Sequence, residues 1–521
     1  MKSLWLDREE TFTPDAFEPG SSYDAVVAGA GLTGLVTALL LARSGQKVLV
    51  LEARYPGAVT TGNTTAKVTL LQGTALSALS RQYSQKQVGA YVEANREGQA
   101  WLLRYLDEHN VPYQRRDAYT YAASAQGAET LREELSAAAT AGLDVDFVRD
   151  AGLPFAVHGA VRLPDQAQIN PMHVLDTLLG DVRDRGGSIV CGVRLRDVTG
   201  SGPATVHTDQ GSVTANEVVL ATGTPVLNRG LYFAKLKPNR SYAAALELPA
   251  GQVPPPGMYI SVEQPTHSLR DYETGGRRLL LVGGHGHPVG QATSEKEHLS
   301  GLLAWAAEHF PGAVPTHTWS AQDYQATNLM PFFGKMPRGH GHVFIGTGYN
   351  KWGMTNAVAA ALGISADILG GQLPWADTIH HRVTSPAGVL SAVGLNGGVA
   401  AKLAKDYGRV AAGGSTQGTT ADDLEPGTVN EPADGARPDP AVRPADGEGR
   451  VFREGSRPIA ASTVNGTTCR LSAVCTHLGG IVHWNDSELT WDCPLHGSRF
   501  SSDGRLLEGP ATKDLPRTDS A

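Results

Sequence analysis

Two short stretches near the end of the chain each pair a cysteine with a histidine: Cys475-Thr-His477 and Cys493-Pro-Leu-His496. These four side chains are candidate metal ligands, because thiolates and imidazoles bind transition metals. The 521-residue chain has four cysteines, and two of them lie here. Zinc fingers group two cysteines and then two histidines. Here each stretch offers one of each, which suits a [2Fe–2S] centre with two thiolates on one iron and two imidazoles on the other. A Cys2His2 zinc site and unligated loops are the alternatives.

The run CTHLGGIVHWNDSELTWDCPLHGSRFSSDGRLLEGPA around these ligands resembles Rieske [2Fe–2S] domains, including its GSRF and GPA segments. Many Rieske domains carry an extra cysteine in each loop, joined as a disulfide, where this chain has Gly480 and Leu495. High-potential members end the second loop in Gly-Ser-x-Tyr, whereas this chain has Ser498 and Phe500. Fewer hydrogen bonds to sulfur stabilise a reduced cluster less, so we expect a potential in the lower half of the roughly −150 to +300 mV Rieske range. His483 lies off the pattern and is expected to be a solvated strand residue.

A glycine pattern stands near the start of the chain, in YDAVVAGAGLTGLVTALLLARSGQKVLVLEA. Gly29, Gly31 and Gly34 lie between an expected strand and an expected apolar helix, and the next strand ends in Glu52. In a dinucleotide site, Gly29 makes the tight turn, Gly31 lets the backbone approach a pyrophosphate, and Gly34 lets the helix pack on the strand. Glu52 would hold both ribose hydroxyls and repel the 2′-phosphate of NADP. The alternative is a glycine-rich turn without a ligand.

Two later segments decide between FAD and NAD. NEVVLATGTPV is an expected strand running toward Gly223, and GHVFIGTGYNKWGMTNAVAAALGISADIL is an expected strand, a turn at Gly348 and a helix. The start of that helix, at Gly353, Met354 and Thr355, can direct its positive dipole end at a reduced flavin. In this order the segments resemble the glutathione-reductase-like FAD fold. More closely, they resemble the D-amino-acid-oxidase type family of FAD oxidoreductases, which includes glycine, sarcosine and γ-glutamylputrescine oxidases. The resemblance implies FAD as a cofactor.

The same resemblance implies residues near the flavin ring. The segment TTGNTTAKVT follows the second strand, where this family brings a loop over the isoalloxazine. Thr64 and Thr65 are therefore candidate flavin contacts, and Lys67 is a candidate for holding flavin N5 through a water. A surface lysine at the start of a strand is the alternative interpretation of Lys67.

Four further side chains are candidates for the substrate side of the flavin. Tyr349 and Lys351 border the flavin by family likeness, in GTGYNKWGM. His285 and His287 lie at the end of the expected strand RLLLVGG, where they face the substrate or cap a loop. The predicted catalytic set is thus Lys67, Tyr349, Lys351 and His285.

Local patterns indicate the elements that position these residues. The segment QVGAYVEANREGQAWLLRYLDEHN has apolar positions in one helical stripe. Asn170 followed by Pro171 is typical of a helix N-cap with proline at the first helical position. Asn465-Gly466 between two apolar runs predicts a hairpin that leads directly to Cys475.

The resemblances imply an α/β FAD-binding domain of the glutathione-reductase-like, Rossmann type, an α+β substrate domain, and a small all-β Rieske domain. The likeness to the flavin family covers about residues 20–372. The predicted ranges are 1–372 for the FAD-dependent oxidoreductase, with FAD-binding segments at about 20–70, 155–225 and 335–372 and substrate segments at about 75–150 and 226–334; 373–420 for a helical connector; 421–449 for a linker rich in proline and acids; and 450–521 for the Rieske domain.

Composition excludes several classes of protein. A net charge of −8 argues against nucleic acid as the main partner. The first twenty residues lack the apolar core of a signal peptide, and the longest apolar run is broken by Arg43 and Lys47, so it cannot span a bilayer. So few cysteines do not form a disulfide scaffold. We therefore expect a cytoplasmic protein with no membrane span.

FAD exchanges two electrons and a Rieske centre passes one, so together they convert between a hydride donor and a one-electron partner protein. The first hypothesis is a dehydrogenase, in which an amine or amino-acid-like substrate reduces FAD and electrons leave through the cluster to an acceptor. The second is a reductase, in which NAD(P)H reduces FAD and the cluster feeds an oxygenase or another partner. It needs a nicotinamide site, and the nearest pattern, LVGGHGHPVG, has Val289 at its third glycine position. A redox sensor is a third class, disfavoured by the substrate-domain-sized insert.

Overall fold

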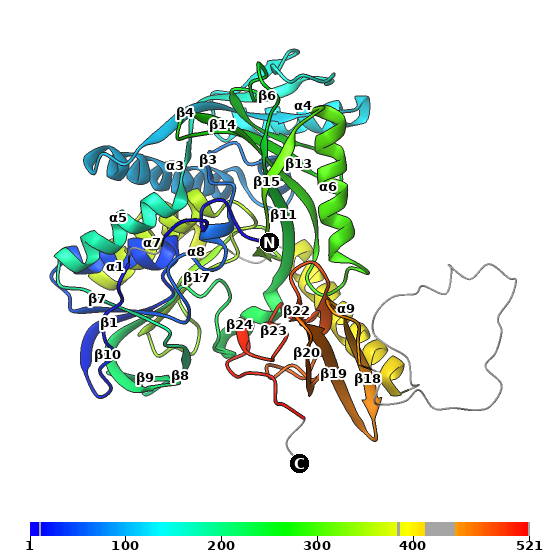
Figure 1. The fold of residues 1–521 in the computed structure, drawn as a ribbon. Helices are drawn as coiled ribbons and strands as arrows, with labels where there is room; N and C mark the ends of the chain where they lie inside the picture. Colours follow the sequence, from blue (N-terminus) through cyan, green and yellow to red (C-terminus); the bar gives the residue numbers. More distant parts are fainter. Residues whose placement is uncertain (10–11, 383–385, 412–442, 519–521) are drawn as a thin grey trace, which may run out of the picture. The chain divides into compact units, whose positions relative to one another are not determined.

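The computed structural model describes residues 1–9, 12–382, 386–411 and 443–518 (Figure 1). The chain forms two compact units. The first comprises Met1–His287 and His298–Leu395, and the second comprises Pro288–Glu297 and Asn396–Ala521. Most of the predicted linker, residues 421–442, lies outside the described residues.

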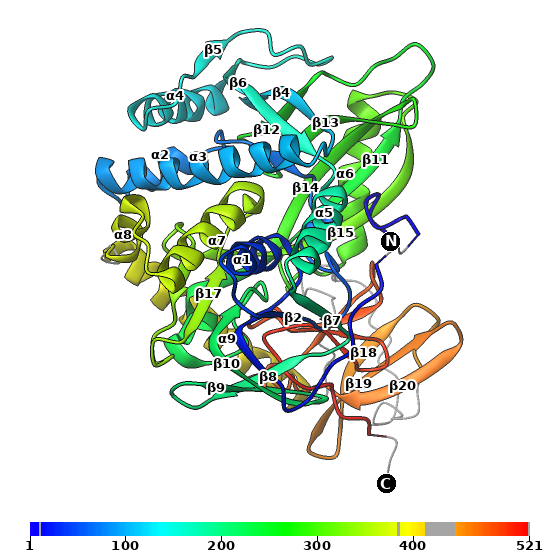
Figure 2. The ribbon, with the colours of Figure 1, turned by 90° about the vertical axis from the view of Figure 1, so that its left-hand side faces the viewer.

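The first unit contains a sheet with parallel central strands, ordered β16-β17-β10-β1-β2-β7, with β9 paired to β10 and β8 to β9 (Figure 2). Strands β17, β10, β1, β2 and β7 are parallel, and β16 and β9 are antiparallel to their neighbours. The strands are β1 (Ser22–Ala28), β2 (Val48–Glu52), β7 (Ser188–Cys191), β8 (Leu195–Thr199), β9 (Ala204–Thr208), β10 (Gly211–Leu220), β16 (Phe332–Lys335) and β17 (Val343–Thr347). Because parallel strands end at the same edge, the turns after β1, β2, β10 and β17 gather there.

Helices α1, α5 and α7 lie side by side over this sheet (Figure 2). Almost every residue of α1 is buried, which explains why its sequence LTGLVTALLLAR is apolar on all sides. The N-cap prediction for α5 is confirmed, since the Asn170 side chain accepts a hydrogen bond from the backbone N–H of Met172 at 3.0 Å, with Pro171 opening the helix. The first unit's helices are α1 (Leu32–Arg43), α2 (Ala75–Ser80), α3 (Gln85–Glu108), α4 (Ala125–Thr140), α5 (Pro171–Asp184), α7 (Gly353–Leu369) and α8 (Pro374–His380), with 3-10 turns at Thr61–Asn63 and Arg229–Lys235.

A second sheet in this unit is mostly antiparallel, ordered β15-β11-β14-β13-β12-β4-β6-β3, with β5 paired to β6. Helix α3 carries the predicted buried stripe and begins with a capping box between Ser84 and Gln87, so that helix prediction is confirmed. The strands are β3 (Lys67–Val68), β4 (Tyr113–Tyr121), β5 (Asp146–Val148), β6 (Ala160–Ile169), β11 (Leu236–Glu247), β12 (Gly257–Ser261), β13 (His267–Thr274), β14 (Arg277–Pro288) and β15 (Val314–Ala326). Helix α6 (Glu295–His309) starts in the second unit and continues in the first.

The second unit is built on two small antiparallel sheets, β18-β19-β20 and β21-β22-β23-β24. Its strands are β18 (Gly449–Glu454), β19 (Arg457–Val464), β20 (Thr467–Ser472), β21 (His483–Asn485), β22 (Thr490–Asp492), β23 (Arg499–Ser501) and β24 (Leu506–Glu508). The predicted hairpin turn is confirmed, because Asn465 and Gly466 join β19 to β20 with φ of +51° and +73°. Trp491 and Phe500 lie in the core between these strands.

The second half of helix α9 (Pro386–Ala411) also belongs to the second unit. Tyr407 donates its hydroxyl hydrogen to the Gly479 carbonyl at 3.0 Å, and Asp406 lies 3.2 Å from both His483 Nε2 and Lys402 Nζ. His483 is only 6% exposed, so the expectation that it is solvated was wrong. A partner far along the chain, Asp406, makes its burial possible.

Within the described ranges, no single helix combines the length and apolar character needed to cross a bilayer. Helices α7 and α8 meet that test together, but they are bent by 96° at the break between them.

Candidate flavin site and iron–sulfur centre

The three predicted glycines form the turn between β1 and α1, and the structure separates their roles. Gly29 has φ of +109°, and a Cβ there would lie 2.5 Å from the Ala221 carbonyl oxygen. A Cβ on Gly34 would lie 1.9 Å from the Gly29 carbonyl oxygen. The fold itself requires both of these glycines. Gly31 differs, because its φ of −88° suits any residue and a Cβ would meet only the Thr61 hydroxyl, at 3.2 Å.

Gly31 is the N-cap of α1 and, as a glycine, has no side chain that could cap the helix. The backbone N–H of Leu32 donates a long hydrogen bond, 3.3 Å, to Thr61 Oγ1. A helix N-terminus beside a residue without a side chain lets a pyrophosphate lie against the backbone. Because the fold does not require glycine at Gly31, these residues fit a bound dinucleotide. Sequence reasoning missed Thr61, although it lies in the threonine-rich run TTGNTT.

Glu52 ends β2 with its carboxylate turned toward the glycine turn. Its Oε2 accepts a hydrogen bond from the backbone N–H of Ala30 at 2.9 Å, and its Oε1 accepts one from Arg54 at 2.8 Å. Burial raises the pKa of Glu52, and these two N–H donors oppose that effect. The carboxylate is thus fixed at the carboxyl edge of the sheet, where contact with the ribose stays a prediction.

The two later turns meet at the same edge. Thr347, the last residue of β17, donates its hydroxyl hydrogen to the Gly223 carbonyl at 2.5 Å and so joins the turns after β10 and β17. Gly223 and Gly348 have φ of +78° and +81°, which favours glycine. Helix α7 begins at Gly353 with no side-chain cap. Its first N–H groups are therefore available to a flavin.

Met354 and Thr355 follow in the first turn of α7, and both are buried. The Thr355 hydroxyl donates to Asn95 Oδ1 at 2.6 Å and accepts from Gln72 Nε2 at 3.2 Å. That side chain therefore holds α7 against α3. A flavin contact of Thr355 would therefore use its main chain, and the flavin contact of Met354 stays a prediction.

The loop before β3 is held by its carbonyl groups, which accept hydrogen bonds from side chains far along the chain. The donor and acceptor pairs are Trp319 Nε1 to the Asn63 carbonyl at 2.8 Å, Trp5 Nε1 to Thr64 at 2.6 Å, and Arg270 Nη1 to Thr65 at 2.8 Å and to Ala66 at 3.1 Å. Four consecutive carbonyls are thereby fixed. This loop holds the predicted flavin contacts Thr64 and Thr65, and a Cβ on Gly283 of β14 would lie 3.5 Å from Thr65 Cγ2.

Lys67 lies directly after this loop, on β3. Its ammonium donates a hydrogen bond to the Tyr259 carbonyl at 2.7 Å. Burial, together with the nearby Arg270, lowers the pKa of Lys67 to about 7. A lysine with such a pKa exchanges a proton near neutral pH, which an exposed lysine does not.

Tyr349 and Lys351 precede α7 but point to different neighbours. Tyr349 shares a 2.9 Å hydrogen bond with the Thr33 hydroxyl of α1, and burial raises the pKa of Tyr349. Lys351 donates its backbone N–H to Asp323 at 2.7 Å, and a Cβ on Gly286 of β14 would lie 3.0 Å from its Nζ. The structure thus brings Lys351 to the end of β14 and turns Tyr349 toward the glycine turn.

His285 is also in β14, with φ of +50°. Its Nε2 lies 3.2 Å from His267 Nε2 on β13, and burial followed by the nearby His298 lowers the pKa of His285. His287 Nε2 lies 3.1 Å from the Tyr242 hydroxyl. Both histidines are therefore strand residues with partners in the second sheet, and a substrate role stays a prediction for His285.

In the second unit, the four predicted metal ligands lie on two loops that are closed by their own backbones. Cys475 N–H donates to the Gly480 carbonyl at 2.7 Å, and Cys493 N–H donates to the Ser498 carbonyl at 2.8 Å. Both cysteines are free thiols and 2% exposed. A hydrogen bond between the two thiols lowers the pKa of Cys475 to about 7 and raises the pKa of Cys493. The two sulfur atoms are thus neighbours.

The two histidines form a second pair. The rings of His477 and His496 have centroids 5.1 Å apart and are nearly perpendicular, at 85°. Burial lowers the pKa of each to about 4, so both are neutral at pH 7, the form that binds metal. Among the described residues no three His, Cys, Asp or Glu side chains are grouped to hold one metal ion. A pair of thiols and a pair of imidazoles fit two irons, each with two protein ligands.

The family model of FAD dependent oxidoreductases, DAO, matches residues 24–366, well over half of the chain. The chain belongs to this family. A second model, the Rieske [2Fe-2S] domain, matches residues 442–519. This DAO-family oxidoreductase therefore has FAD and a [2Fe–2S] cluster as its cofactors, and the predicted fold class and cofactors are confirmed.

Known relatives have one or both parts of this architecture. The Rieske 2Fe-2S iron-sulfur protein YhfW of Bacillus subtilis strain 168 is 29% identical over 524 residues, which cover 99% of this chain and 97% of the relative. The cytochrome b6-f complex iron-sulfur subunit of Chlorobaculum tepidum is 34% identical over 82 residues, 16% of this chain and 43% of the subunit. Glycine oxidase from Geobacillus kaustophilus has a similar fold, with a TM-score of 0.57 and 16% identity over 68% of this chain and 96% of that one. L-amino acid deaminase from Proteus vulgaris gives a TM-score of 0.57 and 13% identity, over 71% of this chain and 100% of that one.

The Rieske domain of this oxidoreductase replaces the bracing disulfide by packing. A Cβ on Gly480 would lie 2.7 Å from both Leu495 Cγ and Cδ1, so the leucine side chain fills the space between the loops. Ser498 is fully buried, its hydroxyl accepts from the Ala511 N–H at 3.0 Å, and the same hydroxyl also bonds the Cys475 thiol and lowers its pKa. The hydroxyl thus lies beside a ligand sulfur.

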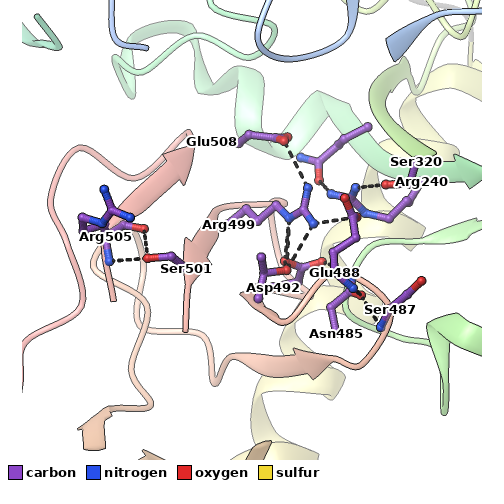
Figure 3. A network of polar contacts seen from close by, with 12 residues as sticks. Arg240, Ser320, Asn485, Ser487, Glu488, Asp492, Arg499, Ser501, Arg505 and Glu508 are labelled. Atoms are coloured by element: carbon purple, nitrogen blue, oxygen red, sulfur yellow. Dashed lines mark hydrogen bonds and ion pairs between the residues drawn. The ribbon is translucent and has the colours of Figure 1, made fainter. Parts of the chain in front are cut away.

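A buried arginine fixes the strand that follows the second loop (Figure 3). Arg499 on β23 contacts Glu488 at 2.5 Å, Asp492 of β22 at 3.2 Å and Glu508 of β24 at 3.4 Å. Removing one partner of such a network leaves a buried charge without its counterion, which is strongly destabilising. The network therefore holds β23, and with it Ser498 and Phe500 on either side of Arg499, in place.

Phe500 allows a direct test of how the cluster's potential is set. It is fully buried opposite Trp491 in the β22–β23 pair. Phe500→Tyr restores the hydroxyl of high-potential Rieske domains and is expected to raise the one-electron potential by up to about 40 mV, the equivalent of one net hydrogen bond of about 1 kcal/mol. Protein-film voltammetry measures the shift. Phe452→Tyr, on β18 of the same unit, is the control and should leave the potential unchanged; a Phe500→Tyr potential equal to wild type would contradict the assignment.

Proposed function

We propose that this protein is a dehydrogenase for an amine or amino-acid-like substrate, with electrons leaving one at a time through the Rieske domain to an acceptor protein. The observation that carries the proposal is the joining of a two-electron FAD module and a one-electron Rieske module in one chain. Bound FAD supplies hydride acceptance, and the bound cluster supplies single-electron transfer. The solved structures with this fold include glycine oxidase, L-proline dehydrogenase and L-amino acid deaminases, whose names all refer to amino acids.

Arg270 supports a substrate with a carboxylate. It is 1% exposed on β13, and its Nη1 holds the carbonyls of the loop that carries Thr65. Its Nη2 is buried and has no hydrogen-bond acceptor in the described part of the chain. A buried guanidinium with an unused N–H group is suited to bind a carboxylate. Arg270 would then fix the acid end of an amino acid and leave its amine near Lys67.

Lys67 supports proton removal from the substrate. In its neutral form the amine donates one hydrogen to the Tyr259 carbonyl and keeps its lone pair free. That lone pair can accept a proton from a substrate ammonium group, which must be neutral before it gives up a hydride.

The pH profile tests this role of Lys67. The rate of FAD reduction at saturating substrate is expected to rise with pH through about 7, because Lys67 is charged below that pH and accepts a proton only above it. Lys67→Met should remove this rise and lower the rate at pH 8 by roughly 10²–10⁴-fold. Anaerobic stopped-flow absorption measures it. The exposed Lys237→Met is the control, and a Lys67→Met profile that still rises through pH 7 would exclude Lys67 as the base.

The reductase and dehydrogenase hypotheses differ in the compound that reduces FAD. The segment LVGGHGHPVG lies mostly in β14, a strand of the antiparallel sheet, and not in the strand–turn–helix of a nucleotide site. The deciding experiment mixes the anaerobic protein separately with an amine and amino-acid panel, NADH and NADPH. Bleaching of the flavin by a panel member and not by the nucleotides supports the dehydrogenase; bleaching by NADH or NADPH alone would replace it with the reductase.

A further inference from the structure

The compact unit that holds the Rieske domain also contains ten residues from the middle of the FAD module's chain. Pro288–Glu297 group with Asn396–Ala521, although they fall inside the range that matches the FAD oxidoreductase family. We name Pro288–Glu297 the arm. It continues directly from β14, which ends at Pro288.

The arm lies against the second ligand loop. Gly290 has φ of +63°, and a Cβ there would lie 2.9 Å from the Asp492 carbonyl oxygen, 3.0 Å from Pro494 N and 3.1 Å from Pro494 Cα. Gln291 Nε2 also donates to the Pro494 carbonyl at 3.3 Å. These neighbours are backbone atoms, which cannot swing aside as a side chain can. Gly290 therefore allows backbone-to-backbone contact on both sides of the ligand Cys493.

The far end of the arm is anchored by Asp486, in the turn between β21 and β22. Its Oδ1 accepts from the backbone N–H groups of Glu295 and Lys296, at 2.9 and 3.0 Å, and its Oδ2 accepts from the Ser294 hydroxyl at 2.7 Å. Asp486 thus caps the first turn of α6 with a carboxylate, a charge-assisted arrangement that favours the helix dipole. The arm is held at both Gly290 and Ser294.

We propose that the arm is the route by which electrons reach the cluster, with Gly290 as its positioning residue. The inference rests on the proposed function. Electron transfer is faster along covalent bonds than across gaps, and its rate falls exponentially with the width of a gap. From Gly286, beside Lys351, the backbone runs without a break to Gly290 and then meets the Cys493–Pro494 loop in van der Waals contact. Between Gly286 and the ligand loop, this route crosses one non-bonded contact, the one at Gly290.

The electron balance fits this route. Oxidation of an amine to an imine releases two electrons and two protons. FAD would accept both electrons as a hydride and give them up singly along the arm. Each electron would reduce one ferric iron of the cluster to ferrous, and the one-electron acceptor protein would remove it before the next arrives. The two protons leave to water.

The test replaces Gly290 with alanine in the full-length protein with both cofactors. The added Cβ overlaps backbone atoms and lifts the arm from the loop, while the ligands and the flavin segments are untouched. We expect unchanged cluster absorption, cluster potential and flavin bleaching, and a cluster reduction that lags flavin bleaching roughly tenfold longer than in wild type. Hydrogen exchange of the 288–297 amides should also become faster. Gly276→Ala is the matched control, because Gly276 at the other end of β14 has φ of +76° and nothing within 4 Å.

A second variant covers the case in which Gly290→Ala fails to fold or to retain its cluster. Asp486→Asn weakens the cap of α6 and should free the arm, with the same lag and the same faster exchange. Cluster reduction at the wild-type rate in the variants that fold would overturn the proposal, since electrons would then use another route. If wild type itself shows flavin bleaching without cluster reduction, or no bleaching by any amine, the proposed function fails and not the arm alone.

Discussion

His496→Ala is expected to leave reduction of FAD by substrate at its wild-type rate and to abolish electron delivery to a one-electron acceptor. His496 is 6% exposed, and its ring pairs with that of His477. Loss of an outer-shell partner of a metal costs roughly 10–100-fold, so loss of a ligand should cost at least about 100-fold in acceptor turnover. Iron content and visible absorption report the cluster, anaerobic stopped flow reports FAD reduction, and steady-state assays report the acceptor.

The control for this experiment is another buried histidine of the same unit. His483 is also 6% exposed, but its Nε2 lies 3.2 Å from Asp406 of α9. His483→Ala should therefore lower the stability of the unit and keep the iron. Wild-type acceptor turnover in His496→Ala would show that electrons leave the flavin directly. Loss of iron in His483→Ala but not in His496→Ala would show that the ligand set is wrong.

The sequence alone indicated the local structure or the ligands where the steric or chemical constraint lies within one short stretch of residues. Gly29 and Gly34 are dictated by contacts within one turn and with the neighbouring strand, so their spacing alone indicates strand, turn and helix. Cys475 and Cys493 are each followed by a histidine within three residues, so the ligand pairs could be predicted without a structure. The pairing of thiol with thiol and imidazole with imidazole is the structural counterpart of that spacing.

The sequence could not give the contacts that join distant segments. Arg270 is 205 residues from Thr65, whose carbonyl it holds, and Trp5 is 59 residues from Thr64. Nothing in the local pattern around Arg270 separates it from a solvated arginine on a strand. The same holds for His483, whose burial depends on Asp406, 77 residues earlier.

Domain membership is hidden from the sequence for the same reason. In the sequence, the arm simply follows a strand of the FAD module. Only its contacts with Pro494 and Asp486 place it in the other unit. The second half of α9 falls in the predicted connector, yet the Tyr407 hydroxyl donates a hydrogen bond to the Gly479 carbonyl of the first ligand loop. The predicted domain ranges therefore stay predictions. The compact units differ from those ranges at the arm and at the second half of α9.

Gly31→Val is expected to release FAD while leaving the apoprotein folded. The φ of −88° and extended ψ of −176° at Gly31 suit valine, and the nearest atom to its Cβ is a movable hydroxyl, that of Thr61. The apoprotein's free energy of unfolding should therefore change by less than about 1 kcal/mol. Against a pyrophosphate on the backbone, the branched side chain should cost about 2–3 kcal/mol, roughly a hundredfold in the Kd of FAD.

A substitution at the nearby Gly34 is the control for this prediction, because the fold requires glycine at that position. Gly34→Ala places a Cβ 1.9 Å from the Gly29 carbonyl, so it should damage the fold whether or not FAD is present. Flavin fluorescence titration of the apoprotein measures the Kd, and thermal unfolding without FAD measures the fold. A folded Gly31→Val protein with wild-type FAD affinity would show that the pyrophosphate does not lie at this turn. An unfolded Gly31→Val apoprotein would show that the fold requires the glycine there, as it does at Gly34.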